Sequence, residues 1–209
     1  MIRPLSDLAV IVPIGYGESH LTGLIYQLKE LPVESVLILV FSRKNQSSPE
    51  PEERMFDGLA NEILHHDISR FELDSDKIIP ALDILDDRRV IIIESPPGRA
   101  AAMNIGSKYT DKSFLWFLHA DSRFTPDTVL LLEQSLNNDP EKMWFFRLTF
   151  MDGRGSRLVQ INQHVARIRS ESWGIPFGDQ GFCLKRELFF KAGRFPENIK
   201  MGEDHIFLW

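Results

Sequence analysis

A continuous apolar run from Phe114 to Leu118 ends abruptly in His119-Ala120-Asp121, and this junction constrains the fold more than any other feature of the chain. Apolar runs of this length are typical of strands buried on both faces at the centre of a parallel sheet. Such a strand delivers His119 and Asp121, two groups able to bind a metal, to the carboxyl edge where open α/β sheets bind ligands. The alternative, that Asp121 only caps the next helix, competes with Thr125-Pro126, which already supplies a cap and a first-turn proline.

Similar apolar runs alternate with helical patterns along the first half of the chain. We predict strands at 8–12, 36–41 and 90–93 and helices at 19–31, 53–66, 76–86 and 99–110. This rhythm predicts parallel βαβ units and so an α/β fold with a mostly parallel central sheet. The second half is expected to add a substrate-binding part, with helices at 125–137, 157–172 and 186–192, an alternating segment at 143–151 and a strand at 181–184.

Composition narrows the class of protein. Of the 209 residues, 43% are hydrophobic and 26% are charged, which predicts a packed core in one large domain or two small ones. The formal net charge of −6 argues against general nucleic-acid binding, because that needs a basic surface. A single cysteine, Cys183, excludes an internal disulfide and fits a reducing compartment. No apolar segment approaches the length of a membrane span, so we expect a cytoplasmic protein with, at most, peripheral membrane contact.

Glycines and polar residues follow the first and third predicted strands. The loop Pro13-Ile14-Gly15-Tyr16-Gly17-Glu18 carries two glycines of a dinucleotide fingerprint, but His20 stands where the third would be, which favours a simple tight turn. Gly98-Arg99 opens a helix whose N-terminus favours an anion, and Asn104 lies further along that helix. The alternative to an anion-binding Arg99 is that its side chain is only a solvated surface charge.

Acidic residues near the end of the chain offer a proton acceptor. Glu203 or Asp204 could act as a general base, or both could be first-turn acids of a final helix. The carboxylate of Asp121 suits Mg²⁺ or Mn²⁺, and the imidazole of His119 favours Mn²⁺ or a softer ion. Two such groups do not close a metal site, so phosphates of a bound ligand would have to complete the coordination shell.

Taken together, the motifs resemble family 2 glycosyltransferases of the GT-A fold, and among them a bacterial branch. The resemblance rests on Gly98-Arg99-Ala100-Ala101-Ala102-Met103-Asn104-Ile105-Gly106, Phe117 to Asp121, Gly178-Asp179-Gln180, Phe195-Pro196-Glu197 and Met201-Gly202-Glu203-Asp204. It covers most of the chain from Leu8 to its end and implies one Rossmann-like GT-A domain, 1–209, with helices on both faces of the sheet. Within it, 1–122 would bind the nucleotide sugar and 123–209, a C-terminally short half, the acceptor.

The resemblance also implies an activity and the residues that perform it. The enzyme would be an inverting, metal-dependent, hexosyltransferase-like protein that moves a sugar from a nucleoside diphosphate to an acceptor hydroxyl. Mn²⁺ or Mg²⁺ would be bound by Asp121 with His119, which stand where the family has Asp-x-Asp, and Asp204 beside Glu203 would be the general base. The implied donor contacts are Pro13, Glu18, Arg99, Asn104, His119, Asp179 and Gln180.

Two departures from the family pattern keep another hypothesis open. The family usually has an aspartate just after its second strand, whereas here the strand runs into Ser42-Arg43 without an acid, and the chain ends at Trp209 soon after Asp204. Both features motivate a non-catalytic module that binds a nucleotide or a sugar phosphate. A nucleotidyltransferase would usually carry lysine in the loop after the first strand, and residues 15–20 contain none.

Overall fold

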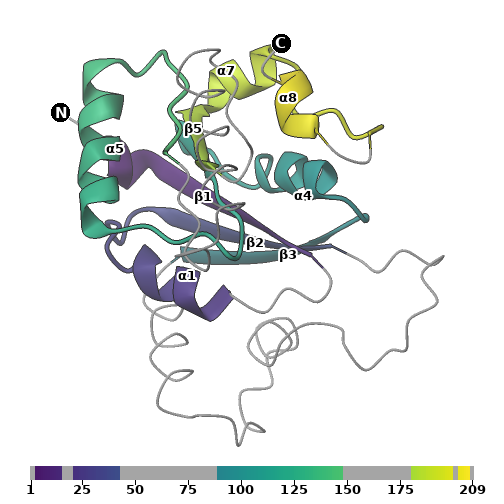
Figure 1. Ribbon diagram of the computed structural model, residues 1–209, viewed down its shortest axis with the longest axis horizontal. Helices are drawn as coiled ribbons and strands as arrows, with labels where there is room; N and C mark the ends of the chain where they lie inside the picture. The colour runs from purple at the N-terminus through teal and green to yellow at the C-terminus, as the bar shows by residue number, and fades with distance from the viewer. Residues whose placement is uncertain (1–2, 16–20, 43–88, 148–179, 200–201, 208–209) are drawn as a thin grey trace, which may run out of the picture.

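A computed structural model describes residues 3–15, 21–42, 89–147, 180–199 and 202–207, without the side chains of Thr22, Asp204 and His205. Figure 1 shows a twisted sheet with helices packed against it. In chain order the elements are η1 (Pro4–Asp7), β1 (Leu8–Ile14), α1 (Leu21–Leu28), β2 (Val36–Ser42), β3 (Arg89–Ser95), α4 (Arg99–Gly106), β4 (Phe114–Phe117), α5 (Pro126–Asn138), β5 (Phe182–Lys185), α7 (Arg186–Lys191) and α8 (Glu203–Phe207). None of these helices combines the length and apolar character needed to cross a bilayer.

The sheet has five strands in the order β3-β2-β1-β4-β5, and only β5 runs antiparallel to its neighbour. The chain moves outward from β1 through β2 to β3 and then returns to place β4 on the other side of β1. The direction of winding therefore reverses between β1 and β4. In open α/β sheets a crevice forms at such a reversal, beside the carboxyl ends of the strands. The predicted α/β fold with a mostly parallel sheet is confirmed.

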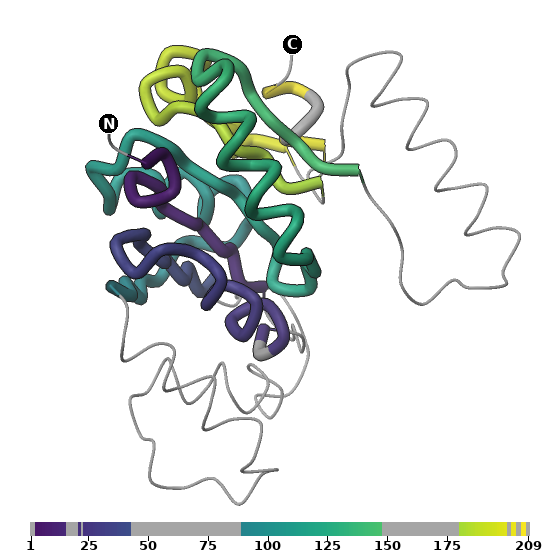
Figure 2. Tube along the Cα trace, turned by 90° about the vertical axis from the view of Figure 1, so that its left-hand side faces the viewer, coloured from purple at the N-terminus to yellow at the C-terminus, as the bar shows by residue number. Residues whose placement is uncertain are grey.

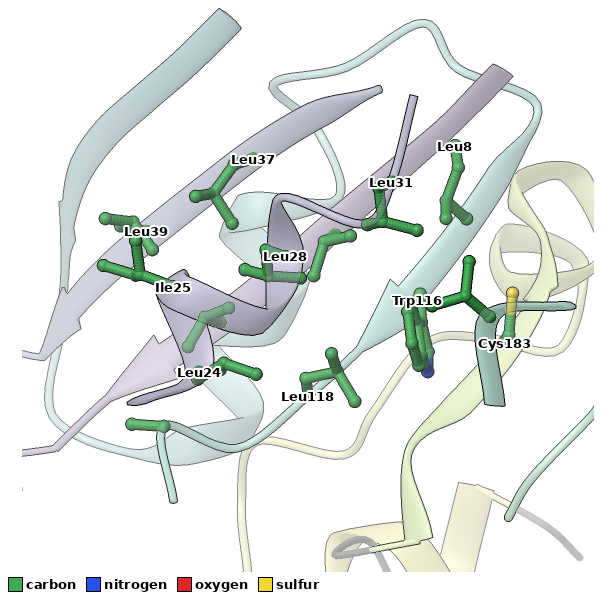
Figure 3. Packing of buried hydrophobic residues seen from close by; sticks show 14 of the residues in the cluster. Leu8, Leu24, Ile25, Leu28, Leu31, Leu37, Leu39, Trp116, Leu118 and Cys183 are labelled. Atoms are coloured by element: carbon green, nitrogen blue, oxygen red, sulfur yellow. The ribbon is translucent and has the colours of Figure 1, made fainter. Parts of the chain in front are cut away.

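Apolar side chains cover both faces of the sheet, which explains the continuous apolar runs. On one face, alternate residues of β1, β2 and β4 pack against α1 and α5. The backbone paths of the two helices can be followed in Figure 2. Figure 3 shows Leu24, Ile25 and Leu28 of α1 beside Leu37 and Leu39 of β2. On the other face, α4 lies over β1, β2 and β3, and α7 packs against β5. The sheet is thus the middle layer of a buried three-layer core.

Helix α4 approaches the sheet closely because the residues on its packing side are small. Ala100 and Ala102 belong to the core cluster on that face. A Cβ atom at Gly106 would lie 2.6 Å from Cγ2 of Ile11 and 3.0 Å from Cγ2 of Val40, so only glycine fits without displacing a strand side chain. This contact fixes where the N-terminal end of α4, with Arg99, lies relative to the carboxyl ends of β1 and β2.

Pro13 lies inside β1 and not in the loop after it, which corrects the predicted strand end at Val12. A proline inside a central strand normally removes a ladder hydrogen bond. Here Ile11 O accepts from Leu118 N–H, so the polar backbone groups of Ile11 face β4. The backbone nitrogen of Pro13, two residues further on, faces the same side. It lies beyond Ile11, the last residue of β1 that pairs with β4. The missing N–H of Pro13 therefore has no ladder position to fill.

The structure also corrects part of the second half. Within the described residues, the predicted alternating segment 143–151 contributes only an isolated bridge between Trp144 and Cys183. Phe146 N–H donates to Gln180 O, and Trp144 N–H donates to Cys183 O. Two steps along the chain from Trp144 to Phe146 therefore match three steps from Cys183 back to Gln180. Gly181, with φ +67°, supplies the extra residue, which is the pattern of a β-bulge and stops a regular ladder. The predicted helices at 53–66, 76–86 and 157–172 lie outside the described residues.

Candidate active site

A tight turn follows β4 at the point where the winding of the sheet reverses. Ser122 N–H donates to His119 O at 3.0 Å, and the Ser122 hydroxyl accepts from His119 N–H at 3.1 Å. The two hydrogen bonds close the turn, whose third residue, Asp121, is exposed to solvent. Ala120 is buried beneath the turn and anchors it to the core. The turn therefore presents an exposed carboxylate just beyond the carboxyl end of β4, as predicted from the strand end.

Arg99, His119 and Glu203, which are far apart in the sequence, meet beside the carboxyl end of β4. Arg99 is the first residue of α4, and its Nε donates to Oε1 of Glu203 in a salt bridge. Its Nη1 lies 3.5 Å from Nε2 of His119. One guanidinium group thus connects the turn after β4 with the start of α8. Three of the predicted site residues are brought together in this way.

Glu203 and Asp204 form the first turn of α8, so the expectation of a final helix with acidic residues at its start is confirmed. Glu203 is nevertheless no solvated helix acid, because its side chain is only 5% exposed. A carboxylate this deeply buried needs a counter-charge, and Arg99 supplies it. The backbone of Asp204 is described, and its side chain lies outside the described part of the structure.

Asn104 occupies a different place from the one predicted. Its Nδ2 donates to the backbone oxygen of Phe195 at 2.8 Å and to Oε1 of Glu197 at 2.7 Å. Its Oδ1 accepts from Phe195 N–H at 3.0 Å, and the residue is 2% exposed. The amide is committed to the protein interior, so we reassign Asn104 from direct donor contact to the support of the chain that leads to α8.

We expect Asn104→Ala to lower the free energy of unfolding by about 2–3 kcal/mol, because it leaves the buried N–H and carbonyl of Phe195 without partners. The comparison of urea denaturation midpoints with the wild type measures this loss. Asn137→Ala is the matched control, since Asn137 is exposed and donates only to Glu133 O within α5. Equal effects of the two substitutions would contradict the supporting role of Asn104.

The remaining predicted donor contacts are distributed unevenly. Gln180 is 3% exposed, and its Nε2 donates to Phe146 O at 2.7 Å, so its amide holds the bulge at the start of β5. Pro13 is buried within β1. Glu18 and Asp179 lie outside the described residues, so their roles remain predictions. A Cβ atom added at the neighbouring Gly181 would lie 3.0 Å from Cδ2 of Leu118, so this segment packs against the end of β4.

The groups present at the turn fit a divalent ion that is shared with a ligand. Among the described residues, no three His, Cys, Asp or Glu side chains are grouped to hold an ion by themselves. The exposed carboxylate of Asp121 is a hard ligand of the type that Mg²⁺ and Mn²⁺ prefer, with phosphate oxygens completing the shell. Nε2 of His119 faces the guanidinium of Arg99, a position unfavourable for a cation, so Asp121 is the stronger candidate.

Two contributors escaped prediction from the sequence. The hydroxyl of Ser122 closes the turn that carries Asp121, and the position of a serine directly after the motif is a usable signal for this role. Glu197 accepts from Asn104 across 93 residues. The Phe195-Pro196-Glu197 motif contributes to the family resemblance, but nothing in the local sequence indicates that Glu197 pairs with Asn104.

Several solved structures share this fold over almost the whole chain. The mannosyltransferase PcManGT from Pyrobaculum calidifontis, in complex with GDP-Man and Mn²⁺, is 18% identical, with a TM-score of 0.59 over 96% of this chain and 50% of that one. S. aureus TarS 1-349 is 15% identical, with a TM-score of 0.62 over 96% of this chain and 53% of that one. TarS 1-349 in complex with UDP-GlcNAc is also 15% identical, with a TM-score of 0.57 over 96% and 52%.

The chain spans about half the length of these structures. At such identities the likeness shows the fold, which is the GT-A type. No curated protein sequence matches the chain. Residues 74–192, more than half of the 209, match the family described as "Glycosyl transferase family 2". This match extends from before β3 through α7 and contains Arg99 and the turn with Asp121. The chain therefore belongs to glycosyl transferase family 2.

Proposed function

We propose that the protein transfers a hexose from a nucleoside diphosphate donor to an acceptor hydroxyl, with inversion at the anomeric carbon and with a divalent ion. Membership of glycosyl transferase family 2 supports sugar transfer in general. Solved structures of similar fold contain GDP-Man with Mn²⁺ or UDP-GlcNAc, which supports a sugar nucleotide as the donor. The bacterial branch suggested by the motifs is part of the same proposal.

One observation carries the proposal: Arg99 joins the turn after β4 to the helix that contains Asp204. Sugar transfer needs a site for the departing diphosphate and a proton acceptor for the attacking hydroxyl within one crevice. The turn with Asp121 is the candidate for the first, and α8 for the second. Their connection through a single side chain supports their use in the same reaction.

In the proposed mechanism the chain binds and orients both substrates. Asp121 would hold Mn²⁺ or Mg²⁺, which when bound would supply Lewis-acid neutralisation of the charge on the diphosphate leaving group. His119 lies beside Asp121, with its Nε2 facing Arg99. Asp204 accepts the proton of the acceptor hydroxyl as that oxygen attacks the anomeric carbon. Attack from the face opposite the diphosphate inverts the stereocentre. We assign residues 1–122 to the donor and 123–209 to the acceptor, within one domain 1–209.

A second candidate is a non-catalytic module that binds a nucleotide or a sugar phosphate. It is favoured by Ser42 at the end of β2, where the family pattern has an acid for the nucleobase. A serine hydroxyl offers one donor and two acceptor sites and can still contact a base, but it lacks the charge. The two candidates differ in one property, the ability to release the sugar.

Hydrolysis of the donor separates them. We expect a thermal-shift screen of UDP- and GDP-sugars with Mn²⁺ to raise Tm selectively for one donor, because a ligand that binds only the folded state stabilises it. The donor selected should then be hydrolysed, or transferred to an added acceptor, in a Mn²⁺-dependent reaction. Binding measured by calorimetry without any release of the sugar would reject the transferase and favour the module.

A further inference from the structure

The contacts of Arg99 differ from those of an arginine that waits for a phosphate. Its Nε is already bonded to Glu203, and its Nη1 faces Nε2 of His119. Arg99 is 40% exposed, whereas the Glu203 side chain is 5% exposed. The positive charge is therefore turned toward a carboxylate inside the protein. A diphosphate would have to compete with Glu203 for the same guanidinium.

The short helix α8 is fixed at both ends of its described length. At its start, Glu203 is paired with Arg99 of α4. At its end, the ring of Phe207 packs against Phe195 at 4.7 Å and against Phe189 at 5.4 Å between centroids. A five-residue helix has little stability of its own, so these contacts hold it in place. Asp204 lies between the two anchors.

The chain that leads into α8 is held to the same helix of the donor half. Asn104, on α4, bonds the backbone of Phe195 in both directions and also bonds Glu197. Arg99, the first residue of α4, precedes Asn104 on the same helix and holds Glu203. Helix α4 itself is seated on β1, β2 and β3. Two side chains of one helix thus fix the approach to α8 and its first residue.

We propose that Arg99 is a positioning residue, which holds the turn after β4 and α8 in register and thereby fixes Asp204, and that it does not bind the donor phosphates. This inference rests on the proposed function, because Asp204 is the proposed base. It assigns Glu203 the role of the buried partner of Arg99. The ion pair of Arg99 and Glu203 links the start of α4 to the start of α8, and we call this pair the strut.

The two possible roles of Arg99 predict different effects of removing the charge of Glu203. If Arg99 bound phosphate, removing the charge of Glu203 would free the guanidinium and tighten nucleoside diphosphate binding. If the pair is a strut, losing either partner loosens α8 and lowers the rate, with little change in diphosphate affinity. Because both substitutions break the same contact, their effects would not add.

The experiment compares Arg99→Ala, Glu203→Gln and the double variant with the wild type. We expect each single variant to lower kcat about tenfold or more, and the double variant to be about as slow as the slower single one. The Kd of UDP and GDP with Mn²⁺, from calorimetry, should stay within about threefold of the wild type. Hydrogen exchange of the amides in α8 should be faster in all three variants, and this readout does not depend on turnover.

Two further variants act as controls. Glu141→Gln removes the salt bridge between Lys185 and Glu141, far from α4 and α8 in the sequence, and should leave kcat and the exchange of α8 unchanged. Arg99→Lys keeps a positive charge that can pair with Glu203. The amides of α8 should therefore exchange more slowly in this variant than in Arg99→Ala. Exchange in the lysine variant as fast as in the alanine variant would contradict the strut.

A rise of about tenfold or more in the diphosphate Kd of Arg99→Ala, with unchanged exchange in α8, would overturn the inference and make Arg99 a phosphate ligand. Multiplicative losses of kcat in the double variant would overturn it as well. If the wild type neither transfers nor hydrolyses any sugar nucleotide, the proposed function fails. The exchange and diphosphate-binding measurements then still decide whether Arg99 is a strut or a ligand.

Discussion

Asp204→Asn is expected to reduce turnover by about 100-fold or more, because the amide cannot accept the proton of the acceptor hydroxyl. The amide has nearly the same shape as the carboxylate, and the neighbouring Glu203 keeps its salt bridge with Arg99. The loss should therefore appear in kcat, with the Kd of the nucleoside diphosphate unchanged. Steady-state kinetics with a sugar-nucleotide donor and calorimetry with UDP or GDP measure the two quantities separately.

The matched control for this variant is Asp127→Asn. Asp127 is an exposed aspartate in the first turn of α5, as Asp204 is an aspartate in the first turn of α8. The control tests whether loss of a favourable charge near a helix N-terminus explains the effect, a contribution of about 0.3–1 kcal/mol. Near-normal turnover of Asp204→Asn, or an equal loss in Asp127→Asn, would reject Asp204 as the base.

Asp121→Ala is expected to lower turnover by about 100-fold or more through loss of the carboxylate that would hold the divalent ion. Unlike the change at Asp204, it should also weaken diphosphate binding in the presence of Mn²⁺ and leave binding without Mn²⁺ unaltered. The backbone should be little affected, because the turn is closed by Ser122 and His119 and not by the aspartate. Titrations of turnover with Mn²⁺ and calorimetry with and without the ion check both parts.

Asp111→Ala provides the comparison for Asp121. Asp111 is exposed and precedes β4, whereas Asp121 follows it, so the two aspartates stand at opposite ends of the same strand. Only the carboxyl end of β4 leads into the turn that lies beside Arg99. We expect Asp111→Ala to retain the turnover and Mn²⁺ dependence of the wild type. A shared loss in both variants would mean that the effect of Asp121 comes from general destabilisation.

The strands were predictable because burial on both faces requires continuous apolar residues. The runs at 36–41 and 114–118 match β2 and β4 to within one residue. The start of α5 was also predictable, since Thr125 caps it and Pro126 occupies its first position. These are local properties, decided by neighbours in the sequence. The place of Asp121 followed from them, because a residue after a buried parallel strand must lie at the carboxyl edge.

Long-range partners were not predictable in the same way. Asn104 and Gln180 were expected to contact the donor, yet their amides bond protein atoms 91 and 34 residues away. A buried asparagine and a ligand-binding asparagine look alike in the sequence, because the difference lies in what the fold brings beside them. The bulge at Gly181 likewise depends on pairing with Phe146, and the described part of the alternating segment, 143–147, forms only an isolated bridge.

The pairing of Arg99 with Glu203 combines both kinds of information. The sequence placed each residue at the start of a helix, and the helix starts were confirmed. Their contact across 104 residues required the fold. From the sequence alone, a cation at one helix start and a carboxylate at another are two independent charges, and nothing indicates that they pair. Together they form a partly buried ion pair, and removing Arg99 would leave the buried carboxylate of Glu203 without its counter-charge.

A crystal structure of the protein with Mn²⁺ and UDP or GDP tests the central claim most directly. The claim is that the carboxylate following β4 binds the ion that in turn binds the two phosphates. We predict an ion within coordination distance of an oxygen of Asp121 and of oxygens from both phosphates, with Arg99 still paired with Glu203. A diphosphate bound away from β4, or an ion that does not contact Asp121, would contradict the account.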